Sequence, residues 1–304
     1  MGYIALRQAF GVQVQPIERL VLDFVTYAES HGHTETATSQ LALDWACNSA
    51  SSQGRHARRL LVVRGFLAYA RASLPQIKVP PLGLLRGARR PAPHIFTDTE
   101  IAELLRQARA LGPRGSLRPH TYVALIGLLI SCGLRIGEAV RLRVDDVRLD
   151  SIPPSLHIDD SKFHKSRLVI LHPTVVTALR RYALQRRRLG YDHCCDTFFV
   201  SEKPGSLPAP SARRTFVQIA RQVGIRPPTG RGPHLHDLRH TFAVRRMLLW
   251  YRQGVDVNEH LPELSVYLGH VRPQDTYWYL TATPELLAAA AKRFESFVNL
   301  GGDL

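Results

Sequence analysis

The chain has 304 residues, and its 40 lysines and arginines outnumber 25 aspartates and glutamates, which gives a formal net charge of +15. A hydrophobic content of 45% is that of a globular protein with room for about two domains, and it excludes a disordered or collagen-like chain. No apolar run reaches the length of about 18 residues that a membrane span needs. The four cysteines fit neither a disulfide framework nor a paired metal site. We therefore expect a soluble, cytoplasmic protein that does not bind a membrane.

The excess positive charge predicts a polyanionic partner. Between Asp44 and Asp98 the sequence has nine basic residues and no acidic one, which is more typical of a nucleic-acid-binding face than of a solvated one. Of the 40 basic residues 35 are arginine, the side chain best suited to paired phosphate contacts, although a GC-rich genome would explain part of that ratio. The residues that we predict to contact DNA are Arg55, Arg58, Arg59, Arg64, Arg89 and Arg90.

The N-terminal part of the chain is predicted to be a small helical domain. Apolar residues recur at helical spacing in three segments, from residue 16 until Gly32, over about 39–48 and over about 54–73. The segment 74–95 that follows holds five prolines, which no regular element tolerates. We interpret it as the connection between two domains and place the helical domain at 1–86, the linker at 87–95 and the second domain at 96–304.

The second domain is predicted to begin with a capped helix, because Thr97 and Glu100 have the spacing of a capping box. The segment 122–132 is apolar almost all round, which predicts a central helix that ends at Gly133. Two β-rich pieces, SLHID and RLVIL, predict a small antiparallel sheet within 147–171. Helices are expected again over about 173–188, 211–223, 237–252, 261–268, 273–280 and 284–298. The predicted fold class is mainly α with a small antiparallel β-sheet, with a helical N-terminal domain before a mixed α+β domain.

Four short motifs of the second domain contain residues typical of phosphate chemistry. Each is weak alone, because a surface arginine, a structural histidine or a packed tyrosine is the commoner role of such a residue. Their order and spacing together make chance agreement small. In chain order they are G-L-R-I-G-E at 133–138, S-K-F-H-K-S-R-L-V-I-L at 161–171, H-D-L-R-H-T at 236–241, and L-G-H at 268–270 with Tyr279 nine residues later.

Cleavage of a phosphodiester without a metal needs cations at the phosphate, a nucleophile in line with the leaving oxygen, and a proton for that oxygen. Arginine meets the first need best, so Arg135 and Arg239 are the candidate phosphate ligands. Glu138 lies one helical turn after Arg135 and can orient its guanidinium. His236 and Arg239 lie at i and i+3, so we expect both on one helix face near an N-terminus that also favours an anion.

In order and spacing these motifs resemble those of the tyrosine recombinases (the phage integrase family), and the resemblance covers nearly the whole chain. It implies a core-binding domain followed by a catalytic domain that forms a 3′-phosphotyrosine, frees a 5′-hydroxyl and exchanges strands through a Holliday junction. Integration, excision or transposition of mobile DNA would be the outcome, with no metal or cofactor. The catalytic residues that the resemblance identifies are Arg135, Lys162, His236, Arg239, His270 and Tyr279.

In this implied site the arginines hold the phosphate, the histidines donate to it or handle the tyrosine proton, and Lys162 protonates the leaving 5′-oxygen. Two assignments leave alternatives open. Lys165 lies in the same turn as Lys162, and Tyr277 lies two residues before Tyr279. Helix positions two apart point about 200° away from each other, so only one tyrosine can face the phosphate. The spacing from His270 favours Tyr279.

The implied partners are double-stranded DNA and other copies of the chain, as a homotetramer on paired recombination sites within the nucleoid. Whether accessory DNA-bending proteins or sister recombinases also take part stays open. The helix expected from 284 can pack within its own chain or dock on a neighbouring protomer. Two other functions are a DNA-binding accessory protein of a synaptic complex that does not cut, and a relaxing enzyme like the type IB topoisomerases.

Metal sites are weaker interpretations of the sequence. Zinc at 192–196 is disfavoured because consecutive side chains diverge and cannot easily close a tetrahedron. A two-metal nuclease would need carboxylates that turn and cap roles already explain, namely Asp145, Asp146, Asp159 and Asp160.

Overall fold

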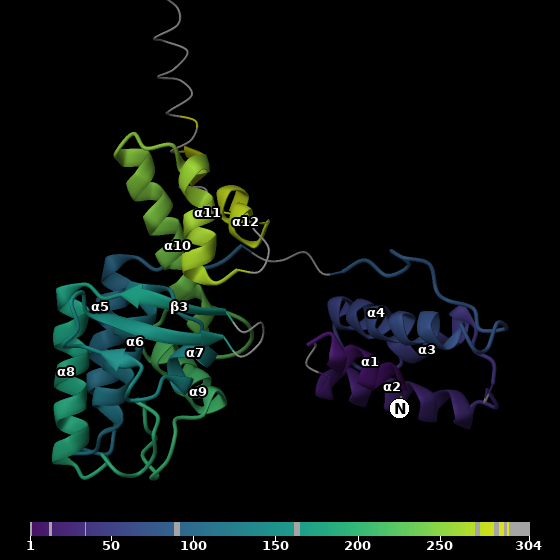
Figure 1. Cartoon of the computed structure of the whole chain (residues 1–304), viewed down its shortest axis with the longest axis horizontal. Coiled ribbons are helices and arrows are strands. Elements are labelled where there is room, and N and C mark those ends of the chain that lie inside the picture. The colour runs from purple at the N-terminus through teal and green to yellow at the C-terminus, as the bar shows by residue number, and fades with distance from the viewer. Residues whose placement is uncertain are drawn as a thin grey trace, which may run out of the picture. The chain divides into compact units, whose positions relative to one another are not determined.

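The computed structural model describes residues 2–11, 14–33, 35–87, 92–160, 165–270, 274–282, 286–288 and 291. The chain divides into two compact units, Met1–Pro91 and Ala92–Leu304 (Figure 1), and the division falls within the proline-containing segment 74–95. Within the described ranges no helix is long and apolar enough to cross a membrane.

The first unit is a bundle of helices around a small apolar core. The three predicted helices are confirmed as α2 (Gln15–Ser30), α3 (Ser39–Cys47) and α4 (Gln53–Ala70). Their buried faces meet at Phe24, Trp45 and Val63, each at most 2% exposed. A further helix, α1 (Gly2–Ala9), was not expected from the sequence, and it packs its one buried residue, Tyr3, against the ring of Phe66.

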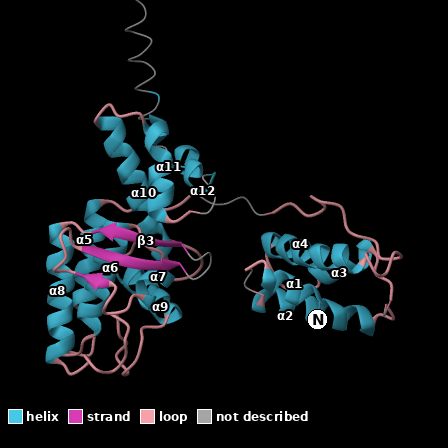
Figure 2. Ribbon diagram, in the orientation of Figure 1, coloured by secondary structure: helices cyan, strands magenta, loops and turns pink. Residues whose placement is uncertain are grey.

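The second unit is mainly helical with one small sheet (Figure 2). The three strands β1 (Val147–Arg148), β2 (Ser155–Asp160) and β3 (Lys165–Ile170) pair antiparallel in the order β1-β2-β3. The helices are α5 (Asp98–Arg109), α6 (Arg118–Cys132), α7 (Ile136–Arg141), α8 (Pro173–Arg188), α9 (Ala209–Gln222), α10 (Leu235–Arg252), α11 (Val257–Leu268) and α12 (Gln274–Ala282). The predicted fold class is confirmed. Most of the helix expected over 284–298 lies outside the described residues.

Helix α6 is the central helix of this unit, as its apolar composition predicts. Eight of its residues are buried, and it packs against α5, α8 and α10. It ends at Gly133, whose left-handed φ of 62° stops the helix. A Cβ at this glycine would come within 2.5 Å of the ring of Phe242, so the close approach of α10 to the end of α6 requires glycine here.

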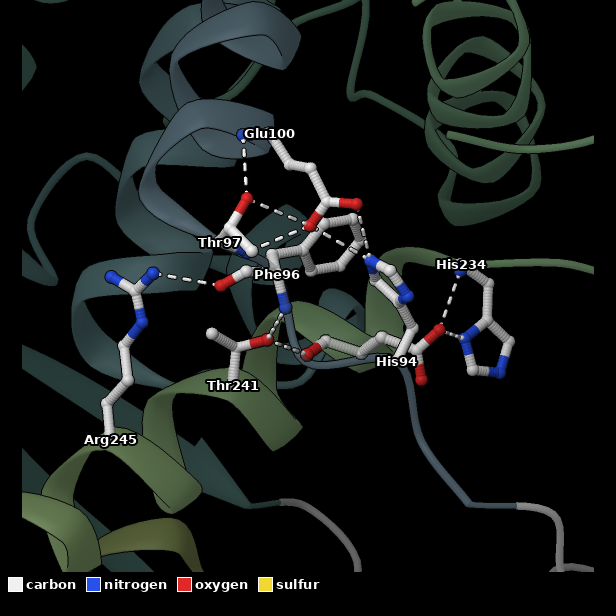
Figure 3. A network of polar contacts seen from close by, with 8 residues as sticks. His94, Phe96, Thr97, Glu100, His234, Thr241 and Arg245 are labelled. Atoms are coloured by element: carbon white, nitrogen blue, oxygen red, sulfur yellow. Dashed lines mark hydrogen bonds and ion pairs between the residues drawn. The ribbon is translucent and has the colours of Figure 1, made fainter. Parts of the chain in front are cut away.

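The segment before α5 is fixed to α10 by a network of polar contacts (Figure 3). The predicted capping box between Thr97 and Glu100 is present and begins α5. The backbone N–H of the buried Phe96 donates to Thr241 Oγ1 at 3.0 Å, and Arg245 Nη2 donates to the Phe96 carbonyl at 2.9 Å. Thr241 Oγ1 in turn donates to the carbonyl of Asp237 at 2.8 Å. These contacts hold the first residues of the second unit against α10, the helix that carries the predicted catalytic residues His236 and Arg239.

Thr241→Val should destabilise the protein by about 1–3 kcal/mol, because the isosteric valine leaves the buried Phe96 N–H without its acceptor. Urea unfolding of the full chain measures the change. The matched control is Thr177→Val on α8, since the Thr177 hydroxyl makes the same type of contact, to the Pro173 carbonyl, on an exposed face. Equal midpoints for the two variants would refute the structural importance of this network.

Candidate active site

The two predicted phosphate-binding arginines come together at the C-terminal end of α11. Arg239 donates from Nη2 to the Leu268 carbonyl at 2.6 Å and from Nη1 to the Gly133 carbonyl at 2.8 Å. Arg135 donates from Nη2 to the next carbonyl along, that of Gly269, at 2.6 Å. Two residues that are 104 apart in the sequence thus bind consecutive peptide groups of the L-G-H motif.

Gly269 is required at this turn for two reasons. Its φ of 67° is left-handed, and it ends α11. An added Cβ would lie 2.8 Å from Nη1 of Arg167 and 3.4 Å from Nη1 of Arg135. The absence of a side chain at Gly269 therefore gives space to the guanidinium groups of Arg167 and Arg135.

Glu138 holds two of these guanidiniums. Its carboxylate is 3% exposed and accepts from Arg135 Nη1 and from Arg167 Nη2, both at 2.8 Å. It also accepts from the backbone N–H of Arg135 at 2.9 Å. Burial alone would raise the pKa of Glu138, but the hydrogen bond and charge of Arg167, together with Arg135, outweigh it and lower the pKa. The carboxylate is thus ionised at neutral pH, in the orienting position expected for it.

Arg167 is a component of the site that the sequence interpretation missed. Its side chain is 12% exposed, and besides Glu138 it binds the Tyr267 carbonyl through Nε at 2.8 Å. Strand β3 alternates, with Val169 buried while Leu168 and Ile170 are more than half exposed. That alternation places Arg167 on the inner face with Val169. Because all four residues after Arg167 in R-L-V-I-L are apolar, this inward position had no signal in the sequence.

Arg239 is buried more deeply than the other arginines of the site. It is 1% exposed, and burial, aided by the charge of Arg135, lowers its pKa to about 10. The guanidinium is therefore still protonated at neutral pH. Its Nε is buried and has no hydrogen-bond partner among the described residues. A buried, unsatisfied N–H of a charged group is costly, and it is suited to an anion that enters the site.

The candidate nucleophile lies on α12. Tyr279 is 1% exposed, whereas Tyr277 is 44% exposed, so the two side chains point to different environments as their spacing predicts. The Tyr279 hydroxyl lies 2.8 Å from Nδ1 of His240. The ring of His270 lies nearly parallel to that of Tyr279, with 6.4 Å between centroids, and its Nδ1 is 2.6 Å from Thr276 Oγ1. The L-G-H motif and the tyrosine thus belong to one cluster.

The first turn of α10 places its two motif residues differently from each other. His236 is exposed, and its ring lies 4.5 Å from the ring of His240. Arg239 points inward to the ends of α6 and α11. At i and i+3 of one helix the two residues therefore differ in depth, with the arginine in the interior and the histidine at the surface.

Some of the predicted catalytic and DNA-binding residues lie outside the described part of the chain. Lys162, Arg89 and Arg90 are not among the described residues, and the side chain of Lys165, the first residue of β3, is not described either. Among the described residues no group of three or more histidine, cysteine or acidic side chains is placed to hold a metal. Asp146 accepts from the backbone N–H of Arg143, which is the turn role expected for it.

The arginines of α4 differ in whether their side chains are exposed or already bind groups within the first unit. Arg55 and Arg58 are exposed. Arg59 stacks on the Trp45 ring at 4.1 Å and forms an ion pair with Asp23 at 3.3 Å, so its charge is opposed by an acidic residue from outside the stretch between Asp44 and Asp98. Arg64 donates through Nε to the Pro80 carbonyl at 2.9 Å. Arg59 and Arg64 therefore stabilise their own unit.

Comparison with known proteins gives matches over most of the chain. The sequence pattern of the phage integrase family matches residues 95–285. The putative integrase/recombinase y4rB of Sinorhizobium fredii is 39% identical over 96% of this chain and 95% of its own length. The tyrosine recombinase XerD of Mycobacterium tuberculosis is 30% identical over 76% of this chain and 70% of its own.

Two solved structures share the fold. XerH recombinase in a post-cleavage complex with palindromic difH substrate superposes with a TM-score of 0.67 at 18% identity, over 89% of this chain and 76% of that chain. A lambda integrase tetramer bound to a Holliday junction superposes with a TM-score of 0.60 at 16% identity, over the same shares of the two chains. The chain belongs to the phage integrase family, that is, to the tyrosine recombinases.

Proposed function

We propose that this site-specific recombinase cleaves and rejoins DNA strands with Tyr279 as its nucleophile. The observation that carries the proposal is the convergence at the turn 268–270. Its carbonyls accept from Arg135 and Arg239, and the histidine that ends it lies beside the ring of Tyr279. Guanidiniums around one turn, with a phenol alongside, are the parts that metal-free cleavage of a phosphodiester requires.

In the proposed reaction the Tyr279 oxygen attacks the phosphorus, the bond from phosphorus to the 5′-oxygen breaks, and that oxygen takes up a proton. The strand then ends in a 3′-phosphotyrosine opposite a free 5′-hydroxyl. Arg135 and Arg239 bind the nonbridging oxygens, where negative charge grows, and His236 and His270 donate to the same phosphate. Attack by a 5′-hydroxyl on the phosphotyrosine reverses the step, so the phosphodiester energy is conserved.

The buried position of Tyr279 adds a requirement to this mechanism. At 1% exposure its hydroxyl reaches a DNA phosphate only after α12 shifts or the side chain turns. Arg239, held by two backbone carbonyls, and Arg135, held by Glu138, need no such movement. We expect the arginines to form a fixed cradle to which the tyrosine is delivered.

A nicked duplex taken from the DNA that flanks the coding gene tests this proposal, because the short fragment diffuses away after cleavage and traps the covalent complex. The wild-type protein should become attached to the 3′ end, leave a 5′-hydroxyl, and do so equally well in EDTA. Tyr279→Phe should abolish the complex, and Tyr277→Phe, as the matched control, should retain it. A free 3′-hydroxyl produced at a rate that EDTA reduces would exclude the mechanism.

Lys162 is the proposed donor of the proton to the leaving 5′-oxygen, and Lys165 is the alternative. A substrate in which sulfur replaces the bridging 5′-oxygen separates the two, because a thiolate leaves without a proton far more readily than an alkoxide. Lys162→Ala should cleave the oxygen substrate about 10²- to 10⁴-fold more slowly and the sulfur substrate at nearly the wild-type rate. If Lys165→Ala gives that pattern instead, the role belongs to Lys165.

Two solved relatives, XerH on difH and the lambda integrase tetramer on a Holliday junction, support double-stranded DNA as the partner and a tetramer on paired sites as the acting form. We propose that the exposed Arg55 and Arg58 of the first unit contact DNA phosphates there, because Arg59 and Arg64 are already engaged. Association with the nucleoid would follow from this binding.

Arg55→Ala combined with Arg58→Ala should weaken DNA binding similarly for all sequences. The slope of log K against log salt should become shallower by about 2, since each lost phosphate contact accounts for about 0.9. Fluorescence anisotropy over a salt series measures both quantities. Arg59→Ala is the matched control, and it should lower stability while leaving the slope unchanged. A double variant with the wild-type slope would contradict the assignment.

A further inference from the structure

We propose that His240 is the base that takes the phenolic proton of Tyr279 during cleavage and returns it during rejoining. This inference rests on the proposed role of Tyr279 as nucleophile. His240 follows Arg239 directly on α10, and it is not among the catalytic residues that the family resemblance implies. Handling of the tyrosine proton was expected instead from His236 or His270.

The geometry favours His240 for this role. A proton acceptor must lie within hydrogen-bond reach of the proton, about 2.6–3.2 Å between heavy atoms. Nδ1 of His240 lies 2.8 Å from the Tyr279 hydroxyl, and the two rings meet at 62° with 5.3 Å between centroids. The ring of His270 lies nearly parallel to the Tyr279 ring with its centroid 6.4 Å away, and the same ring has its Nδ1 at Thr276. The contact from His240 is thus directed at the oxygen that reacts.

Burial makes a base at this position necessary. His240 is 4% exposed and Tyr279 is 1% exposed, so water has little access to the phenol. An isolated phenolate in such a place is costly, because burial disfavours the charged form. The proposal therefore requires that the contact with His240 is kept when α12 shifts or the side chain turns toward the phosphate. The proton then leaves while the bond to phosphorus forms, and that intermediate is avoided.

The proton balance is simple. A neutral His240 that carries its own proton on Nε2 accepts the phenolic proton at Nδ1 as the tyrosine oxygen bonds to phosphorus. The 5′-oxygen departs with a proton from the general acid. On rejoining, the 5′-hydroxyl attacks, the bond from tyrosine to phosphorus breaks, and the imidazolium of His240 returns its proton to the phenol. No metal or external reactant enters the sequence of steps.

The first test compares two substitutions at this position. His240→Asn places an amide near the position of Nδ1 and keeps a polar contact to the phenol but cannot accept its proton, whereas His240→Phe keeps a ring and loses the contact. Both should slow single-turnover cleavage of the nicked duplex by about 10²-fold or more. His260→Asn is the matched control, because His260 pairs with Glu263 on α11 and should leave the rate unchanged. Urea unfolding shows whether each variant is folded.

The deciding test replaces Tyr279 by 3,5-difluorotyrosine, whose phenol is more acidic and needs less help to ionise. In this background the rate defect of His240→Asn should shrink at least tenfold. An equal defect with either tyrosine would mean that His240 only supports the structure, and it would overturn the inference. A wild-type protein that forms no covalent complex would overturn the role of Tyr279 itself. A wild-type protein that cleaves, beside an equally active His240→Asn, would overturn only the role of His240.

Discussion

Replacing Arg239 by lysine is expected to slow strand cleavage by about 10²- to 10³-fold, the loss that follows removal of one fixed donor from an oxyanion site. Lysine keeps the charge but lacks the planar fork, so it cannot bind the Gly133 and Leu268 carbonyls and also present a further N–H to phosphate. Single-turnover cleavage of the nicked duplex measures the effect.

The same substitution separates catalysis from folding. Each carbonyl that loses its donor in the interior costs about 1–3 kcal/mol of unfolding free energy, so the lysine variant should also be less stable. Arg252→Lys is the matched control, because Arg252 is an exposed residue at the end of the same helix. If Arg239→Lys cleaved at the wild-type rate, the phosphate cradle described above would be wrong.

Replacing Glu138 by glutamine should lower the unfolding free energy by about 3–5 kcal/mol at neutral pH. The variant leaves Arg135 and Arg167 around a buried neutral amide, and removal of one partner from a buried ionic cluster costs about that amount. Cleavage should also slow, because Arg135 loses the partner that orients its guanidinium. Glu103→Gln is the control, since the Glu103 pair with Arg106 is exposed, and its unfolding midpoint should match that of the wild type.

The stability difference between wild type and Glu138→Gln should depend on pH in a defined direction. The folded protein lowers the pKa of Glu138, so its contribution is fully present above the pKa of an unfolded glutamate, about 4.3. That contribution is lost as the pH falls through the lowered pKa of the folded state. The difference should therefore be constant above about pH 5 and shrink on further acidification. A difference that grew at low pH would contradict the ionised state assigned to Glu138.

Local signals in the sequence predicted most of the fold. The capping box at Thr97, the apolar segment before Gly133 and the β-rich piece R-L-V-I-L each depend on neighbours in the chain, and the structure confirms all three. The short helices α1 and α7 were not predicted, because helices of eight and six residues are too short to show a repeated helical period.

The site was less completely predicted, because its contacts join distant segments. Arg59 has no acidic neighbour in the sequence, but Asp23 from another helix pairs with it. Arg167 meets Glu138 only because β3 lies beside α7, which the order of residues does not reveal. In the sequence His240 is a member of the H-D-L-R-H-T motif with no assigned role. Its proposed role depends on the contact with Tyr279, which lies on α12. Spacing identified the motif residues, whereas tertiary packing supplied their partners.

The covalent link itself gives the most direct test of the central claim, that Tyr279 attacks the phosphorus. The complex trapped on the nicked duplex is digested with nuclease and protease, and mass spectrometry locates the nucleotide remnant by fragmentation between Tyr277 and Tyr279. We predict that the remnant is on Tyr279 and is attached through a 3′-phosphate. A remnant on Tyr277 or on any other residue, or a complex that dissociates on denaturation, would contradict the mechanism.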